Sequence, residues 1–125
     1  MATKDDSYAH ALRVSSMVPK DYQRVAWLHD AIEDGYITGN ESYLAIEFAQ
    51  MGYGLESWET EALILLTRLK SDTYMGYINR IDRAKGLSGQ CARAVKICDL
   101  QDNLARPGKE RLKLRYRKAL KTLNG

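Results

Sequence analysis

The sequence contains little cysteine: Cys91 and Cys98 are the only two among its 125 residues. They stand seven positions apart in a segment that we expect to be helical, which separates their Cα atoms by about 10 Å. A disulfide needs Cα atoms within about 7 Å of each other. We therefore expect two reduced thiols that pack in the core as small residues.

Long apolar runs and low-complexity segments are also missing. No stretch approaches the roughly 18 uninterrupted apolar residues of a membrane span, and the first residues lack the apolar segment of a secretory signal. We find no repeat and no linker, and the length suits one domain. The sequence predicts a single domain over residues 1–125, located in the cytoplasm and without a membrane partner.

Alternation of apolar and polar residues, the pattern of β-strands, is absent as well. Helical periodicity dominates instead, and it predicts a compact all-α bundle of about six to seven helices. Residues that can cap a helix stand at Ser7, Asp21, Asn40, Ser57, Thr73 and Ser88. We expect helices at about 7–17, 21–35, 40–51, 57–69 and 73–85, a sixth from 88 to a break at 106–108, and a last one after it. The very apolar stretch 62–66 should be central.

The formal net charge is only +3, but the charge is unevenly placed. Residues 106–121 hold eight basic residues and a single acid, so the rest of the chain is slightly acidic. The last helix should be amphipathic, with its apolar face formed by Leu112, Leu114, Tyr116, Leu120 and Leu123. Its basic face is either a solvated helix surface or a field that attracts a polyanion, such as nucleotide phosphate or nucleic acid.

Histidine occurs only twice, and His29 stands in a dense acidic cluster. Its neighbours Asp30, Glu33 and Asp34 lie on roughly the same side, because residues three and four apart share a helix face. Carboxylates that close repel one another and their pKa values rise unless a cation holds them. No lysine or arginine occurs between positions 24 and 68. A divalent metal is the economical partner for this cluster.

Residues far along the chain can complete such a site. His10 is the only other histidine, and Asp99 follows an apolar stripe with Asn103 one helical turn later. Taken alone, His10 fits a surface histidine and Asp99 fits a group at a helix end. An aspartate among apolar neighbours is nevertheless costly to bury without a partner.

Taken in order, these residues form a known pattern. The pattern begins with a lone histidine at position 10. A His-Asp pair followed closely by Glu-Asp stands at 29–34, and Asp-x-x-x-Asn stands at 99–103. The pattern resembles that of the HD-domain metal-dependent phosphohydrolases, in particular the RelA/SpoT hydrolase domain and the stand-alone small alarmone hydrolases. The resemblance extends from about residue 8 to residue 104, with a weaker echo at 115–120.

The resemblance implies an HD-type helical bundle and a role for each residue. The implied ligands of a divalent metal, typically Mn²⁺, are His10, His29, Asp30 and Asp99. Glu33 and Asp34 would orient and deprotonate the attacking water, and Asn103 would hold the sugar or phosphate of the substrate. Further candidates for substrate binding are Lys96, Arg13 and Tyr116. The implied reaction is hydrolysis of a phosphate ester, such as release of pyrophosphate from the 3′ position of a (p)ppGpp-type guanosine alarmone.

The sequence departs from the family pattern around the substrate rather than at the metal ligands. Ala11 replaces a proline, Lys4 is the sole basic candidate upstream of His10, and Gln101-Asp102 replaces a Leu-His-like pair. Recognition of the base must therefore differ or be loose.

Several alternatives remain open at this point. The substrate could instead be an adenosine alarmone, a deoxynucleoside triphosphate or an NADPH-like phosphorylated dinucleotide. The chain could also be an HD scaffold that uses its basic helix on nucleic acid or a protein partner, or a purely structural helical domain. We expect a small-molecule nucleotide as the partner rather than nucleic acid, and self-association is left open.

Overall fold

The computed structural model describes residues 4–33, 52 and 54–125. Within these ranges the chain forms six α-helices, one short 3-10 helix and no strand, so the prediction of an all-α fold is confirmed. The elements are α1 (Lys4–Met17), η1 (Lys20–Tyr22), α2 (Gln23–Glu33), α4 (Ser57–Leu66), α5 (Tyr74–Arg83), α6 (Gly86–Ala105) and α7 (Glu110–Asn124).

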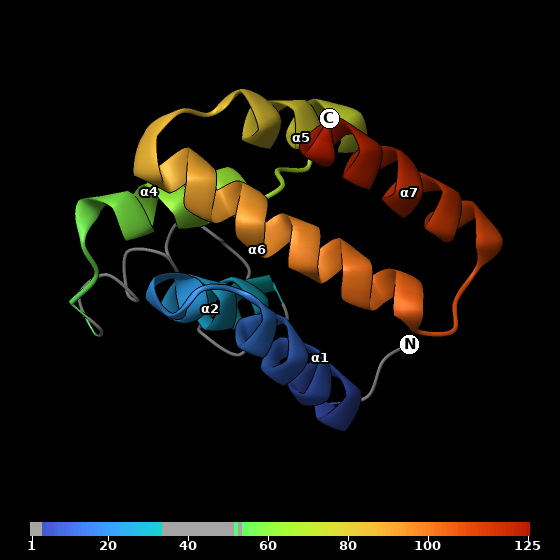
Figure 1. Ribbon diagram of the computed structural model, residues 1–125, viewed down its shortest axis with the longest axis horizontal. Helices are drawn as coiled ribbons and strands as arrows, with labels where there is room; N and C mark the ends of the chain where they lie inside the picture. Colours follow the sequence, from blue (N-terminus) through green and yellow to red (C-terminus); the bar gives the residue numbers. More distant parts are fainter. Residues whose placement is uncertain (1–3, 34–51, 53) are drawn as a thin grey trace.

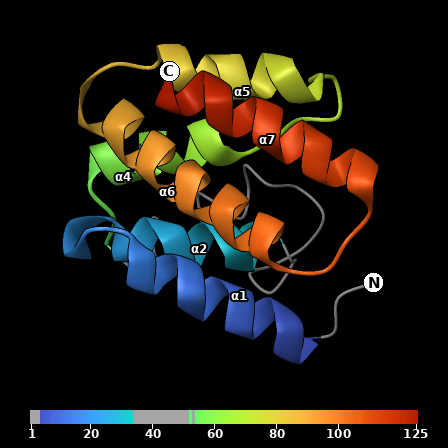
Figure 2. The same cartoon turned by 45° about the vertical axis from the view of Figure 1, so that its right-hand side comes forward.

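Helix α6 is the structural axis of the domain. It crosses the middle of the molecule with α1 and α2 on one side and α5 and α7 on the other (Figures 1 and 2), and it packs against all of these helices and against α4. Each neighbour contributes side chains that are removed from solvent, among them Val14, Val25, Leu63, Ile78 and Ala119. A residue on α6 can therefore meet groups from nearly every other helix.

The stretch 62–66 on α4 is buried on one face only. Ala62, Leu63 and Leu66 are buried, whereas Ile64 is 39% exposed. The helix therefore joins the core through one face only, because an α-helix in a bundle turns every third or fourth residue away from the core. α6, which is less apolar in sequence, takes the central place instead.

Several helix starts differ from the expected ones. α1 begins at Lys4, so the expected cap Ser7 lies inside it. The expected cap Asp21 lies inside η1, which begins after Pro19, and α2 starts only at Gln23. The cap of α4 is Glu56 rather than Ser57: the Glu56 and Glu59 side chains each accept a hydrogen bond from the other's backbone N–H. This reciprocal arrangement is a capping box, here with glutamate in place of the usual serine or threonine.

Other boundaries follow the prediction. Thr73 caps α5 by accepting a hydrogen bond from the backbone N–H of Gly76 at 3.0 Å. The break at 106–108 separates α6 from α7 as expected. α6 begins two residues earlier than predicted, at Gly86, whose φ of +74° suits glycine better than any other residue.

The buried face of α7 is narrower than the predicted apolar stripe. Ala119 and Leu123 are buried, but Leu114 is 58% exposed, so its assignment to the inner face is wrong. Both cysteines are free thiols, as predicted, with Cys91 in the core and Cys98 half-buried. Burial raises the pKa of the Cys91 thiol to about 12.

The predicted helix at 40–51 and the predicted end of the second helix at Gly35 lie outside the described residues. No helix in the described ranges has the length and apolar character needed to cross a membrane.

An ion pair between the buried Glu59 and the half-exposed Arg24 joins α2 to α4. The Glu59 carboxylate is 3% exposed, and it accepts hydrogen bonds from the Arg24 guanidinium and from the backbone N–H of Glu56. The bond from Arg24 is the main reason that the pKa of Glu59 lies below its usual value despite burial.

This pair should make stability depend on pH. Because the folded state lowers the pKa of Glu59, its contribution is present in full above the unfolded value of about 4.5 and disappears as the pH falls through the folded value. At pH 7 we expect wild type to unfold at a higher urea concentration than Glu59→Gln, and the gap should narrow as the pH falls below the unfolded-state pKa of Glu59. Urea unfolding followed by circular dichroism measures the gap, and one that stayed constant to low pH would contradict the ionic contribution.

Candidate metal centre

His10 on α1 is held between two carboxylates of α6. Its Nδ1 lies 2.5 Å from Asp102 Oδ2, and its Nε2 lies 2.7 Å from Asp99 Oδ1. Asp99 and Asp102 are three residues apart, so they share the face of α6 that is turned toward α1. All three side chains are buried. The imidazole thus supplies the partner that each buried carboxylate requires.

Both carboxylates remain ionised in this cluster. Burial raises the pKa of Asp99, but Lys96, His10 and His29 outweigh it and hold the pKa well below its usual value. Burial likewise raises the pKa of Asp102, and hydrogen bonds from Arg13 and His10 bring it below the usual value. Ionised carboxylates are acceptors only, and His10 places one ring nitrogen against each of them.

His29 and Lys96 lie on the Asp99 side of the cluster. Lys96 Nζ donates to Asp99 Oδ2 over 3.1 Å and stands 5.2 Å from the centre of the Tyr77 ring. His29 on α2 is buried, and it is near enough to Asp99 to lower that pKa electrostatically. His29, a predicted metal ligand, thus lies within electrostatic range of Asp99, and Lys96, a predicted substrate contact, bonds to Asp99 directly.

Asp102 also binds two arginines. Arg13, three residues after His10, donates from Nε to Asp102 Oδ1 at 2.6 Å and from its terminal nitrogen to Oδ2 at 3.0 Å. Arg106 Nε lies 3.6 Å from Asp102 Oδ2, and its terminal nitrogen donates to Asn103 Oδ1 at 2.5 Å. The predicted substrate contacts Arg13 and Asn103 are thus fixed by the same group of side chains that fixes His10.

Tyr74 on α5 adds a polar group near Lys96 and Asp99. Its ring packs against the Tyr77 ring at 6.3 Å between centres, in agreement with the expectation that these tyrosines pack. Its hydroxyl is buried and has no hydrogen-bond partner among the described residues. Burial raises the pKa of Tyr74 despite the nearby cations Lys96 and Arg115, so the hydroxyl stays protonated and is a hydrogen-bond donor.

The chemistry of this donor set fits a divalent ion. Mixed imidazole and carboxylate ligation suits Mn, Fe or Zn. Neighbouring ligands of an octahedral ion with bonds of about 2.1 Å lie about 3 Å apart, and His10 Nε2 faces Asp99 Oδ1 at 2.7 Å. An increase of a few tenths of an ångström in the distance between His10 Nε2 and Asp99 Oδ1 would bring both atoms to the spacing of neighbouring ligands on one ion. Asp102 contacts the other ring nitrogen, Nδ1, and so has the position of a carboxylate that orients a metal-binding histidine without touching the metal.

Part of the predicted site falls outside the described residues. Asp34 is not described, and Asp30 and Glu33 belong to α2 by their backbone but their side chains are not described. Among the side chains that are described, no group of three or more histidines, cysteines, aspartates or glutamates has the arrangement of a metal site.

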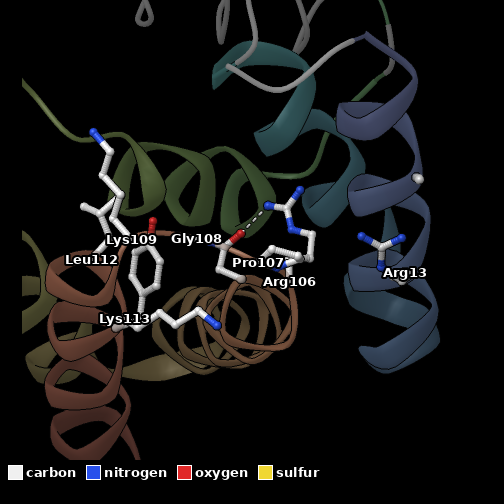
Figure 3. A pocket seen from close by; sticks show the side chains of 10 residues that line it. Arg13, Arg106, Pro107, Gly108, Lys109, Leu112 and Lys113 are labelled. Carbon is white, nitrogen blue, oxygen red and sulfur yellow. Dashed lines mark hydrogen bonds between the residues drawn. The ribbon is translucent and has the colours of Figure 1, made fainter.

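A cavity of about 700 Å³ opens beside the cluster, between α1, the end of α6 and the start of α7 (Figure 3). Three of the four predicted substrate contacts line it, namely Arg13, Asn103 and Tyr116. The fourth, Lys96, is not among its lining residues and is buried beside Asp99.

Asp102 is the site residue that the sequence analysis did not assign. Two sequence signals could have identified it. It stands three residues after Asp99, and Arg13 stands three residues after His10, so each pair occupies one helix face. A facing His-Arg pair and Asp-Asp pair are complementary in charge and in hydrogen bonding.

Substitution of Asp102 should weaken metal binding without unfolding the domain. Asp102→Asn keeps the shape but removes the charge that orients the His10 ring. We expect the affinity for Mn²⁺ to fall by about 10- to 100-fold, the usual effect of losing an outer carboxylate. Calorimetric titration with Mn²⁺ measures this, with Asp82→Asn on the exposed side of α5 as the matched control. Equal affinities of Asp102→Asn and wild type would remove Asp102 from the site.

Comparison with known proteins adds no further constraint. No protein-family model matches the chain, and no curated protein matches its sequence. Function is therefore inferred from the residue pattern and from the geometry around His10.

Proposed function

We propose that the chain is a metal-dependent phosphohydrolase that acts on a phosphorylated nucleotide. The observation that carries the proposal is the position of His10, whose two ring nitrogens meet Asp99 and Asp102 within 2.7 Å in the interior of the domain. A buried His–carboxylate arrangement with a second histidine nearby is typical of a metal centre, where an outer carboxylate fixes the orientation of the ligating ring. A purely structural helical domain has no need for such a cluster.

The proposed ligands of the divalent ion, Mn²⁺ in the first place, are His10, His29, Asp30 and Asp99. Such an ion, when bound, polarises a phosphoryl oxygen and makes water acidic enough to attack at neutral pH. Asp102 orients His10, and Lys96 neutralises charge beside Asp99. Glu33 and Asp34, which follow His29 by four and five residues, hold and deprotonate the attacking water in this proposal.

The proposed substrate is a (p)ppGpp-type alarmone that loses pyrophosphate from its 3′ position. This choice rests on the order of residues His10, 29–34, Asp99 and Asn103, which resembles the alarmone hydrolases. The departures from the family pattern at Ala11 and at 101–102 leave other phosphorylated nucleotides as the alternative substrates: an adenosine alarmone, a deoxynucleoside triphosphate or an NADPH-like dinucleotide.

A panel of these nucleotides tests the proposal. The full chain is incubated with each one and Mn²⁺, with and without excess chelator, and the products are identified by ion-exchange chromatography. We expect release of pyrophosphate or phosphate from at least one nucleotide, and its abolition by the chelator. Turnover of another nucleotide while alarmones stayed intact would show that the substrate is wrong, and no turnover of any would overturn the proposed activity.

Nucleic-acid binding is the second candidate function, and the basic character of α7 favours it. Seven of the eight basic residues in 106–121 lie at or beyond the cap of this helix. Strongly salt-dependent binding of an oligonucleotide by protein that contains no metal would support this candidate over a hydrolase.

A further inference from the structure

The cavity beside the candidate metal centre is lined with cations. Its basic side chains are Arg13, Arg106, Lys109 and Lys113, and no carboxylate is among the described residues that line it. In Figure 3 the two lysines extend from the α7 side and Arg13 from α1, with Arg106 between them. Three separate segments of the chain therefore direct positive charge at one space.

The charge in the cavity is only partly neutralised. Arg13 is paired with Asp102, and Arg106 lies near the same carboxylate. The side-chain ammonium groups of Lys109 and Lys113 form no hydrogen bond or ion pair with any part of the chain that the structure describes. The Arg106 Nε is buried and likewise has no hydrogen-bond partner there. The Asp102 carboxylate is thus shared by two arginines, and the positive charges of Lys109 and Lys113 are not neutralised by any described carboxylate.

The backbone adds to this field. α7 begins at Glu110 with Lys109 as its N-cap, and no side chain caps the start by a hydrogen bond. The first N–H groups of a helix have no partner within it and carry partial positive charge. Because Pro107, Gly108 and Lys109 line the cavity, this positive helix end borders the same space as the four cations.

Shape distinguishes the cavity from a surface for nucleic acid. A volume of about 700 Å³ falls within the range of small-molecule pockets. An extended polyanion would follow charge along a surface, but Lys118 and Lys121, farther along α7, are not among the lining residues. The concentration of charge at the start of α7 therefore favours a compact anion.

We propose that this cavity binds a phosphate or diphosphate group of the substrate other than the one that is hydrolysed. Asp102 lies between the two places, because it bonds to Arg13 of the cavity and to His10 of the candidate metal centre. The substrate is then a nucleotide with phosphate at two separate positions, one at each place. This assignment of the substrate rests on the proposed hydrolase function, whereas binding of an anion in the cavity does not require metal.

Binding of pyrophosphate to metal-free protein tests the proposal. The full chain is stripped of metal, dialysed free of chelator and titrated with inorganic pyrophosphate in a calorimeter at low ionic strength. We expect binding to wild type, and about 10-fold weaker binding after Lys109→Gln with Lys113→Gln, since each lost charge removes a strong contact to the anion. The matched control, Lys118→Gln with Lys121→Gln, removes the same charge from the same helix and should bind within about 2-fold of wild type.

A second pair of variants compares a negative and a neutral side chain placed at the cavity. A side chain at Gly108 would meet no atom within 4 Å of its Cβ, so Gly108→Glu and Gly108→Gln should both fold. We expect Gly108→Glu to abolish pyrophosphate binding and Gly108→Gln to retain most of it, because the two differ in charge and hardly in size.

Two results would overturn the proposal. One is equal binding by the Lys109/Lys113 double variant and its control. The other is tighter binding of a mixed-sequence oligonucleotide that both double variants weaken equally, since this would assign α7 as a nucleic-acid surface. Because the titration contains no metal and no turnover, its failure is distinguishable from failure of the proposed hydrolase activity.

Discussion

Glu33→Gln should retain metal and lose most turnover. Glutamine keeps the size of the side chain but cannot accept a proton from the attacking water. General base catalysis contributes about 100- to 10,000-fold to rate, and we expect kcat to fall within this range. Because Glu33 is not among the proposed ligands, Mn²⁺ should bind as in wild type. Steady-state kinetics with the nucleotide that is turned over fastest, combined with Mn²⁺ titration, measures both effects.

The control for this substitution is Glu61→Gln, which makes the same change on the exposed side of α4. It should leave kcat and metal affinity unchanged. A Glu33→Gln enzyme with near-normal kcat would mean that another group deprotonates the water, and Asp34 would be the next residue to substitute. Loss of metal from Glu33→Gln would instead make Glu33 a ligand.

Asp99→Asn should abolish both metal binding and turnover. Asp99 meets His10 at 2.7 Å and Lys96 at 3.1 Å in the interior, and it is the one proposed carboxylate ligand whose side chain the structure describes. Its amide would bind a divalent ion poorly, so the loss should exceed the about 10- to 100-fold loss expected of an outer carboxylate. Calorimetric titration of Asp99→Asn and Asp102→Asn with Mn²⁺ shows directly which variant loses more affinity for the metal.

Loss of the Asp99 charge also leaves the buried Lys96 ammonium without its carboxylate, and removal of one member of a buried pair is destabilising. A second variant, His10→Gln, therefore accompanies it, because it leaves the Lys96–Asp99 pair intact. Circular dichroism establishes that each variant is folded. If a folded Asp99→Asn and a folded His10→Gln both bound Mn²⁺ as wild type does, the metal would have to lie elsewhere.

Local signals in the sequence predicted those boundaries that depend on a single residue type. Thr73 caps α5 because its hydroxyl reaches the Gly76 N–H, and the break at 106–108 follows from proline and glycine. The start of α4 was missed because Glu56 and Glu59 cap each other, a role for which serine or threonine is the usual signal. Burial was missed at Ile64 and Leu114, where the choice of inner face depends on neighbouring helices and not on apolar character alone.

The candidate site shows the same division between local and long-range information. The pattern of residues identified His10 and Asp99, which stand 89 positions apart in the sequence and whose Nε2 and Oδ1 atoms lie 2.7 Å apart in the structure. Asp102 was missed because its role depends on how α1 lies against α6, which brings Arg13 and His10 to one carboxylate. The cavity at the start of α7 could not be predicted either, since its lining comes from three segments that only the packed helices bring together.

The metal content of the purified full chain tests the central claim most directly. The protein is prepared without chelator, supplied with Mn²⁺, freed of unbound metal by gel filtration and examined by elemental analysis, with Asp99→Asn treated in parallel. The account predicts about one divalent ion per chain for wild type and almost none for Asp99→Asn. A wild-type protein that is folded and holds no metal after this treatment would contradict it.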